Sequence, residues 1–103
     1  MRESTIENYL RLSVAKAGGA TRKFVSPGRR GVTDQIVIWP CRYLSFGVLC
    51  NAPAEIHFIE VKAPRKTARS AQVREHNRLM LLGCVVLVLD TKEKIDNYVE
   101  KYK

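Results

Sequence analysis

Residues 55–63, EIHFIEVKA, begin as an apolar strand and end with an acid and a base two positions apart, Glu60 and Lys62. Side chains alternate between the two faces of a strand, so the odd-numbered residues from 57 to 61 point one way and the even-numbered residues from 58 to 62 point the other. Glu60 and Lys62 are therefore neighbours on one face, with Cα atoms about 7 Å apart. Burial of both charges costs desolvation unless they have partners or water. The pair is either an ordinary exposed ion pair at a sheet edge or part of a functional site.

A helix and two strands are predicted before this stretch. Apolar residues spaced at i, i+3 and i+4 predict an amphipathic helix over residues 3–17, which Gly18-Gly19 ends. Residues 20–25, ATRKFV, predict a strand that leads into a Ser-Pro-Gly turn. Residues 34–39, DQIVIW, are β-branched and apolar and predict a strand that begins on Asp34. We expect residues 40–53, which mix aromatic residues with glycine and proline, to form a long connection.

Pro64 ends the strand of residues 55–63. Two helices and one strand are predicted after this proline. A helix is expected over residues 70–82, with Ser70 as its N-cap and Gly83 as its stop. The all-apolar run CVVLVLD, residues 84–90, is typical of a strand covered on both faces. Thr91 caps a short final helix over residues 91–102. The order α-β-β-β-α-β-α predicts an α/β fold, in which a meander and a helical crossover give a mixed β-sheet flanked by helices.

Composition predicts one basic domain over residues 1–103. The chain carries 18 Lys and Arg against 10 Asp and Glu, a net charge of +8 at pH 7. Such an excess favours a polyanionic partner, although a charged surface that only keeps the protein in solution is the alternative. The loop SPGRRGVT holds Arg29 and Arg30 between glycines, and we expect it to contact phosphates rather than bases. The other candidate contacts with a nucleic-acid backbone are Lys23, Arg65 and Lys66.

Cysteine and histidine spacing predicts neither disulfides nor a zinc site. The three cysteines, Cys41, Cys50 and Cys84, form no CxxC pair, and His57 and His76 have no Cys or His at ligand spacing. No apolar run approaches the roughly 20 residues of a membrane helix, and the start lacks the apolar stretch of a signal peptide. We therefore expect no membrane partner and a cytoplasmic location.

Asp34 changes the interpretation of the acid-base pair, because it starts the strand that precedes Glu60. If these two strands pair, both carboxylates converge where the strands leave the core. Mg²⁺ and Mn²⁺ prefer oxygen ligands, and Mg²⁺ takes one or two carboxylates together with water and phosphate oxygens. Such a cation can polarise a phosphodiester and lower the pKa of an attacking water, while Lys62 stabilises the developing charge. Together with the basic surroundings, this favours a nuclease.

Asp34 followed by Glu60-Val61-Lys62 resembles the PD-(D/E)xK nuclease signature. The segments SPGRRGVTD and FIEVKAP, Gln72 and a glycine before an apolar strand resemble its VRR-NUC (virus-type replication-repair nuclease) branch, and the resemblance covers nearly the whole chain. An ExK triplet alone is weak evidence, whereas the ordered set is much more specific. One departure is Thr33, where the family usually has proline, but a β-branched residue also favours extended backbone.

The resemblance implies a restriction-endonuclease-like fold and a role for each matching residue. Asp34, Glu60 and the Val61 carbonyl would bind Mg²⁺ or Mn²⁺, and Lys62 would be the catalytic lysine. Gln72 would orient water or substrate beside the metal. A glutamate of the first helix also belongs to the pattern, and Glu3 is preferred to Glu7, although both can lie on one helix face.

The function implied is a divalent-metal-dependent, structure-selective DNA endonuclease. Stand-alone relatives resemble resolvases, so the implied substrate is branched DNA such as Holliday junctions and the implied assembly is a homodimer. A viral member would act in the host cytoplasm. The alternative is a basic nucleic-acid-binding module without catalysis, in which Glu60 and Lys62 are only a surface pair.

Overall fold

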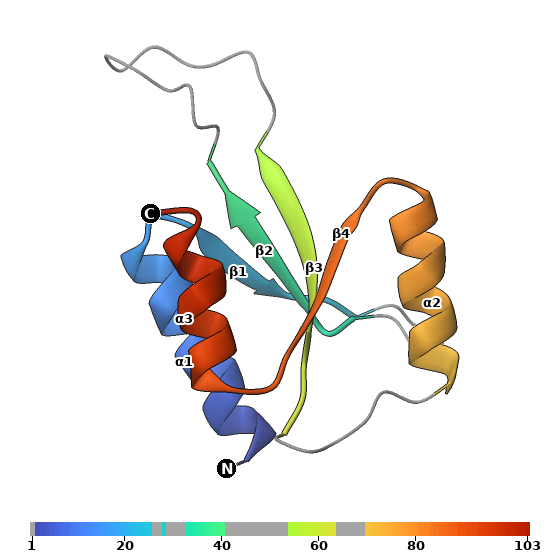
Figure 1. Ribbon diagram of the computed structural model, residues 1–103, viewed down its shortest axis with the longest axis horizontal. Helices are drawn as coiled ribbons and strands as arrows, with labels where there is room; N and C mark the ends of the chain where they lie inside the picture. Colours follow the sequence, from blue (N-terminus) through green and yellow to red (C-terminus); the bar gives the residue numbers. More distant parts are fainter. Residues whose placement is uncertain (1, 26–27, 29–32, 41–53, 64–69) are drawn as a thin grey trace.

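The computed structural model describes residues 2–25, 28, 33–40, 54–63 and 70–103. Helices and strands follow one another in the predicted order α-β-β-β-α-β-α (Figure 1). Their bounds are α1 (Glu3–Lys16), β1 (Ala20–Lys23), β2 (Gln35–Trp39), β3 (Glu55–Val61), α2 (Ser70–Leu81), β4 (Val85–Leu89) and α3 (Lys92–Glu100).

The strands form one mixed sheet in the order β1-β2-β3-β4. The first three strands are antiparallel neighbours, as short connections in a meander allow. β4 runs parallel to β3 because α2 carries the chain back to the starting end of the sheet. The predicted meander, crossover and fold class are therefore confirmed.

Glycines end α1 and α2 as predicted. Gly18 and Gly83 have φ angles of 94° and 93°, a left-handed conformation that costs glycine no Cβ clash. The residue after each glycine donates its N–H back into the last helical turn, from Gly19 to Val14 O and from Cys84 to Leu79 O, at 3.0 Å in both cases. This pattern is the Schellman motif, which satisfies carbonyls that a helix end leaves unpaired.

The hydrophobic core lies between the sheet and the pair α1 and α3, which cover one face, whereas α2 lies on the other face (Figure 1). Odd-numbered residues of β2 and β3 point into this core, as the alternation predicted. The buried apolar side chains are Ile6, Leu10, Val14, Val37, Trp39, Ile59, Val61, Leu89, Ile95, Tyr98 and Val99. The even-numbered face is therefore left for α2 and for Glu60.

The prediction that residues 84–90 form a strand covered on both faces is wrong. β4 is the last strand of the sheet, and Val85 and Val88 are 43% and 40% exposed. The side of α2 that is turned inward is polar, because its buried residues are Glu75 and His76. An apolar run in the sequence is typical both of an interior strand and of an edge strand that its covering helix leaves partly exposed to solvent.

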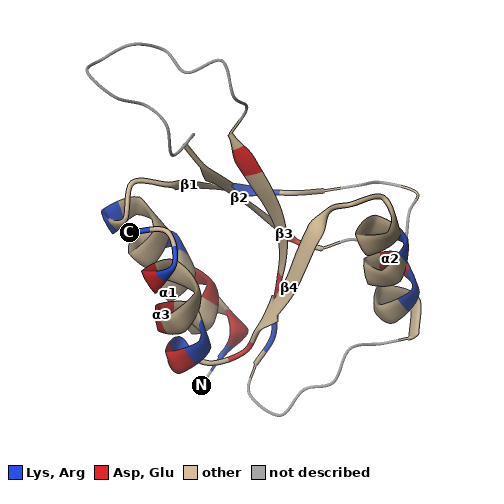
Figure 2. Cartoon of the chain, turned by 45° about the horizontal axis from the view of Figure 1, so that its top comes forward, with Lys and Arg blue, Asp and Glu red and all other residues tan. Residues whose placement is uncertain are grey.

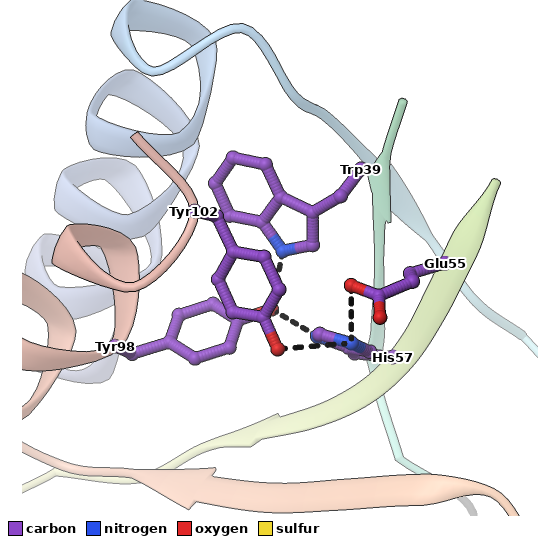
Figure 3. A network of polar contacts seen from close by, with 5 residues as sticks. All are labelled: Trp39, Glu55, His57, Tyr98 and Tyr102. Atoms are coloured by element: carbon purple, nitrogen blue, oxygen red, sulfur yellow. Dashed lines mark hydrogen bonds and ion pairs between the residues drawn. The ribbon is translucent and has the colours of Figure 1, made fainter. Parts of the chain in front are cut away.

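A buried polar network ties the C-terminal end of α3 to the sheet (Figure 3). The Trp39 indole N–H donates to the Tyr98 hydroxyl at 2.8 Å, and that hydroxyl lies 2.5 Å from His57 Nδ1. The second ring nitrogen of His57, Nε2, lies 3.5 Å from the Tyr102 hydroxyl and 3.9 Å from Glu55 Oε2. Trp39 and Tyr102 also stack, with ring centroids 4.8 Å apart.

The Tyr98 hydroxyl is the centre of this network, because it contacts both Trp39 and His57. Because the Tyr98 oxygen accepts from Trp39, its own hydrogen is available for His57 Nδ1, and burial raises the pKa of Tyr98 so that this hydrogen is retained. The other ring nitrogen of His57, Nε2, is near the Tyr102 hydroxyl and Glu55. The network therefore depends on one hydroxyl that both donates and accepts.

Tyr98→Phe is expected to lower the free energy of unfolding by about 1–3 kcal/mol, because it removes the buried hydroxyl that contacts both the Trp39 N–H and His57 Nδ1. Tyr9→Phe is the matched control, since its hydroxyl bonds Asp96 at an exposed position and its loss should cost less than the loss of the Tyr98 hydroxyl. Urea unfolding of both variants measures the difference. Equal losses would contradict the network.

Candidate active site

Asp34 and Glu60 lie at the same end of the sheet. The β2–β3 register pairs Gln35 with Ile59, so one step further Asp34 lies across from Glu60. Asp34 Oδ1 accepts from the Val61 N–H at 3.4 Å, which places that carboxylate beside the backbone of β3. The predicted strand pairing thus brings the two carboxylates together, with the Val61 backbone beside them.

Glu60 is 4% exposed and is contacted by both polar residues that the sequence placed near it. Gln72, on α2, donates from Nε2 to Glu60 Oε1 at 2.7 Å. The Lys62 ammonium lies 3.5 Å from the same oxygen, and the Lys62 side chain is 14% exposed. The other oxygen, Glu60 Oε2, is buried without a hydrogen-bond partner among the described residues. The pair is therefore not the exposed ion pair that the alternative interpretation required.

The pKa values of both carboxyls are raised. Burial raises the pKa of Glu60 to about 7, with a further increase from the charge of Asp34, and the nearby Lys62 ammonium only partly offsets this. Burial also raises the pKa of Asp34, although the Val61 N–H opposes the change. Each ionised form is disfavoured by lost solvation and by the other carboxylate. A cation between them would relieve both costs.

The helix carboxylate nearest Asp34 is Glu7 rather than Glu3. Glu7 Oε1 accepts from Gln35 Nε2 at 2.9 Å, and Gln35 adjoins Asp34 in sequence. The charge of Glu7 raises the pKa of Asp34 more than that of Glu3, which lies exposed in the first turn of α1. These contacts favour Glu7, whereas the preference for Glu3 rested on position in the sequence, and the role of either glutamate at the site stays a prediction.

Exposed basic residues flank the acidic pair on both sides. Lys23 pairs in register with Gln35, so it lies at the same end of the sheet as Asp34. Arg74 and Arg78 are exposed on α2, across the sheet from β1, and Figure 2 shows basic residues on both elements. The remaining predicted contacts with nucleic acid, Arg29, Arg30, Arg65 and Lys66, lie outside the described residues.

Two buried features near the site were not predicted from the sequence. Glu75 and His76 are 4% and 7% exposed, on the side of α2 that also carries Gln72. Their i+3 and i+4 spacing from Gln72 was the available signal, because it places all three on one helix face. Thr33 is fully buried and its hydroxyl has no partner among the described residues. A proline at this position would have no such hydroxyl to bury.

The donors present suit a hard divalent cation. Two carboxylates and a backbone carbonyl are oxygen ligands, and a buried carboxylate oxygen without a partner is a suitable place for one. Within the described ranges no group of three or more His, Cys, Asp or Glu is arranged to hold a metal. Binding of Mg²⁺ at Asp34 and Glu60 stays a prediction, made because Mg²⁺ is bound by one or two carboxylates with water and phosphate filling its other positions.

Among the described helices, none has the length and apolar character needed to cross a membrane.

Comparison with known proteins identifies a relative in sequence and a similar solved structure. No family model matches the chain. A phage protein, "Putative nuclease p44" from Acyrthosiphon pisum secondary endosymbiont phage 1, is 43% identical over 93 residues, which cover 90% of this chain and 87% of that protein. A solved structure described as a VRR_NUC domain is similar with a TM-score of 0.75 and 30% identity, over 98% of this chain and 97% of the other.

Glu60→Gln is expected to remove a pH dependence of stability. Because the folded pKa of Glu60 lies above its ordinary value of 4.5, the folded state holds this proton more tightly than the unfolded state. The resulting stability is present below about pH 4.5 and is lost as the pH rises through about 7. In buffer without divalent cations, the stability of Glu60→Gln relative to wild type should therefore rise by roughly 1–3 kcal/mol between pH 5 and pH 8.

Urea unfolding at several pH values measures this change. Glu100→Gln, which alters an exposed carboxylate on α3, is the matched control and should show no comparable trend. A difference between Glu60→Gln and wild type that stays constant across this range would contradict the raised pKa.

Proposed function

The chain belongs to the VRR-NUC family of nucleases, and we propose that it is a divalent-metal-dependent DNA endonuclease that cleaves branched DNA such as Holliday junctions. The observation that carries the proposal is the convergence of Asp34 and Glu60 beside Lys62 at one end of the sheet. The raised pKa of Glu60 supports it, because a carboxylate that is costly to ionise in the free protein gains most from a bound cation.

In the proposed site, Asp34, Glu60 and the Val61 carbonyl hold Mg²⁺ or Mn²⁺. The cation would supply Lewis-acid polarisation of the phosphodiester. The Lys62 ammonium balances the negative charge that develops on the phosphate, which requires it to remain protonated and directed into the site. Gln72 orients the Glu60 carboxylate through the 2.7 Å hydrogen bond and offers its amide to water or substrate. The helix glutamate, Glu7 or Glu3, adds negative charge near Asp34.

The basic residues bind the DNA backbone in this proposal. Lys23, Arg74 and Arg78 are exposed on two elements that flank the site, and the chain carries a net charge of +8. Neutralised phosphates release counterions, so binding should weaken steeply with salt. We also propose that the protein acts in the cytoplasm, in the host cytoplasm if it is viral.

Glu60→Ala should reduce cleavage of a four-way junction by at least about 100-fold in Mg²⁺ or Mn²⁺, because it removes a ligand and leaves Asp34 alone. Gel assays with junction, flap and linear duplex substrates measure the rate and the preference. Glu100→Ala is the control and should cleave like wild type, since Glu100 is exposed and lies on α3, on the opposite face of the sheet.

Metal binding separates an enzyme from a basic binding module. Calorimetry should detect Mn²⁺ binding by wild type that Asp34→Asn weakens. Affinity should rise between pH 6 and pH 8, because the proton on Glu60 competes with the cation. DNA binding without any metal binding, and equal cleavage by wild type and Glu60→Ala, would instead favour the non-catalytic module.

A homodimer is the assembly proposed for this enzyme, since cleavage of a four-way junction needs two sites. Exposed apolar side chains support a self-association surface. Leu81 and Leu82 are 88% and 81% exposed at the end of α2, and Val85 and Val88 are exposed on the adjacent edge strand. Exposed groups of this kind commonly mark interaction surfaces.

Replacing Leu81 and Leu82 with lysine is expected to shift a dimer toward monomer, because charges replace the apolar side chains that would be buried between copies. Sedimentation velocity at micromolar concentration measures the change. A wild-type protein that sediments as a monomer at all concentrations would contradict the dimer, and an unaffected double variant would place the interface elsewhere.

A further inference from the structure

His76 is a buried imidazole on the side of α2 that is turned toward the site. It lies one helical turn after Gln72, whose amide reaches Glu60, and it is 7% exposed. Its Nε2 atom is buried and has no hydrogen-bond partner among the described residues. Burying a polar atom without a partner costs about 1–3 kcal/mol, so this arrangement calls for an explanation.

Lys62 is the cation that acts on His76 from the sheet. Burial lowers the pKa of His76, the charge of Glu75 opposes this, and the Lys62 ammonium lowers the pKa further. His76 is therefore a neutral imidazole near pH 7. Glu75 itself is paired with Arg78 at 3.3 Å, so its charge is already partly balanced. The ring nitrogen of a neutral imidazole is an acceptor, and it is able to accept a hydrogen bond from an ammonium that comes within reach.

Cation binding at Glu60 would change what Lys62 can contact. In the free protein Lys62 and Gln72 share one oxygen, Glu60 Oε1, at 3.5 Å and 2.7 Å. A cation held by Glu60 would make this oxygen a poorer acceptor and would place a second positive charge near Lys62. A mostly buried ammonium then needs another acceptor, and His76 Nε2 is an unused one on the facing helix.

We propose that His76 is a positioning residue for Lys62: its Nε2 atom accepts a hydrogen bond from the Lys62 ammonium once a divalent cation engages Glu60. The inference rests on the proposed function, because it assumes the cation site at Glu60. In this arrangement neutral His76 carries its proton on Nδ1. The hydrogen bond fixes the direction of the Lys62 side chain and leaves its ammonium positively charged. Lysine would otherwise be free to move among rotamers away from the phosphate.

Nitrogen-15 NMR of the histidine side chains tests whether Lys62 donates a hydrogen bond to His76 when Mg²⁺ binds. This measurement does not depend on DNA cleavage. Addition of Mg²⁺ to wild type should move the His76 Nε2 resonance upfield, as expected of a nitrogen that becomes a hydrogen-bond acceptor. The same titration of Lys62→Met should leave that resonance in place. Calorimetry on both proteins establishes that Mg²⁺ is bound. Mg²⁺ binding by wild type without any movement of the resonance would overturn the inference and leave the proposed function intact.

Cleavage kinetics provide the second test. His76→Phe keeps a ring but has no acceptor, and its kcat should fall roughly 10-fold to 100-fold while KM for DNA and the Mg²⁺ affinity stay near wild type. His76→Gln keeps a neutral acceptor near the position of Nε2 and should recover most of kcat. Asn77→Ala, on the exposed side of α2, is the control.

A double-mutant cycle shows whether His76 acts through Lys62. In the Lys62→Met background, His76→Phe should cause no further loss of single-turnover rate, because the ammonium that it positions is absent. Equal losses in both backgrounds would overturn the inference. A wild type that neither binds Mg²⁺ nor cleaves DNA would instead overturn the proposed function, and this inference with it.

Discussion

The antiparallel register between β2 and β3 is the constraint on which the rest of the molecule depends. A slip of one residue would turn every side chain of a strand to the other face of the sheet. Val37 and Ile59 would then leave the core, and Glu60 would enter it. The same pairing that buries the apolar residues against α1 and α3 therefore fixes the acidic residues on the opposite face, at the end where Asp34 and Glu60 meet.

The acidic site destabilises the folded protein electrostatically, and the packing of the hydrophobic core has to offset this cost. Buried Glu60 and partly buried Asp34 both have raised pKa values, and one oxygen of Glu60 has no partner among the described residues. This is the pattern expected where ligand binding, rather than folding, satisfies the charges. The buried polar network of Trp39, Tyr98 and His57 lies at the other end of the same strands, where the hydrogen bonds are made within the protein.

Most of the fold was predictable because each element carries its own local signal. Consecutive β-branched residues mark β2, apolar spacing marks α1, and Gly18 and Gly83 mark two helix ends. The pairing of Asp34 with Glu60 followed from strand order, and the family resemblance added Gln72. The inner side of α2 was harder to predict, because its buried residues are polar and its apolar residues face outward. The choice between Glu3 and Glu7 and the exposure of β4 both depend on tertiary contacts that local patterns do not contain.

The ends of β2 and β3 divide the molecule into two regions with different freedom to change. Pro40 and Ala54 lie at the Trp39 end, roughly 20 Å along the strands from Asp34, given about 3.3 Å per residue. Loop closure cost grows only slowly with length, so a longer or grafted segment between these two anchors should leave the chemistry unaffected. The connection between β3 and α2 has no such latitude, because Lys62 and Gln72 at its two ends must both reach Glu60. Changes between Pro40 and Ala54 can therefore create contacts with new partners at the Trp39 end of the sheet. The end that carries Asp34 and Glu60 tolerates fewer changes.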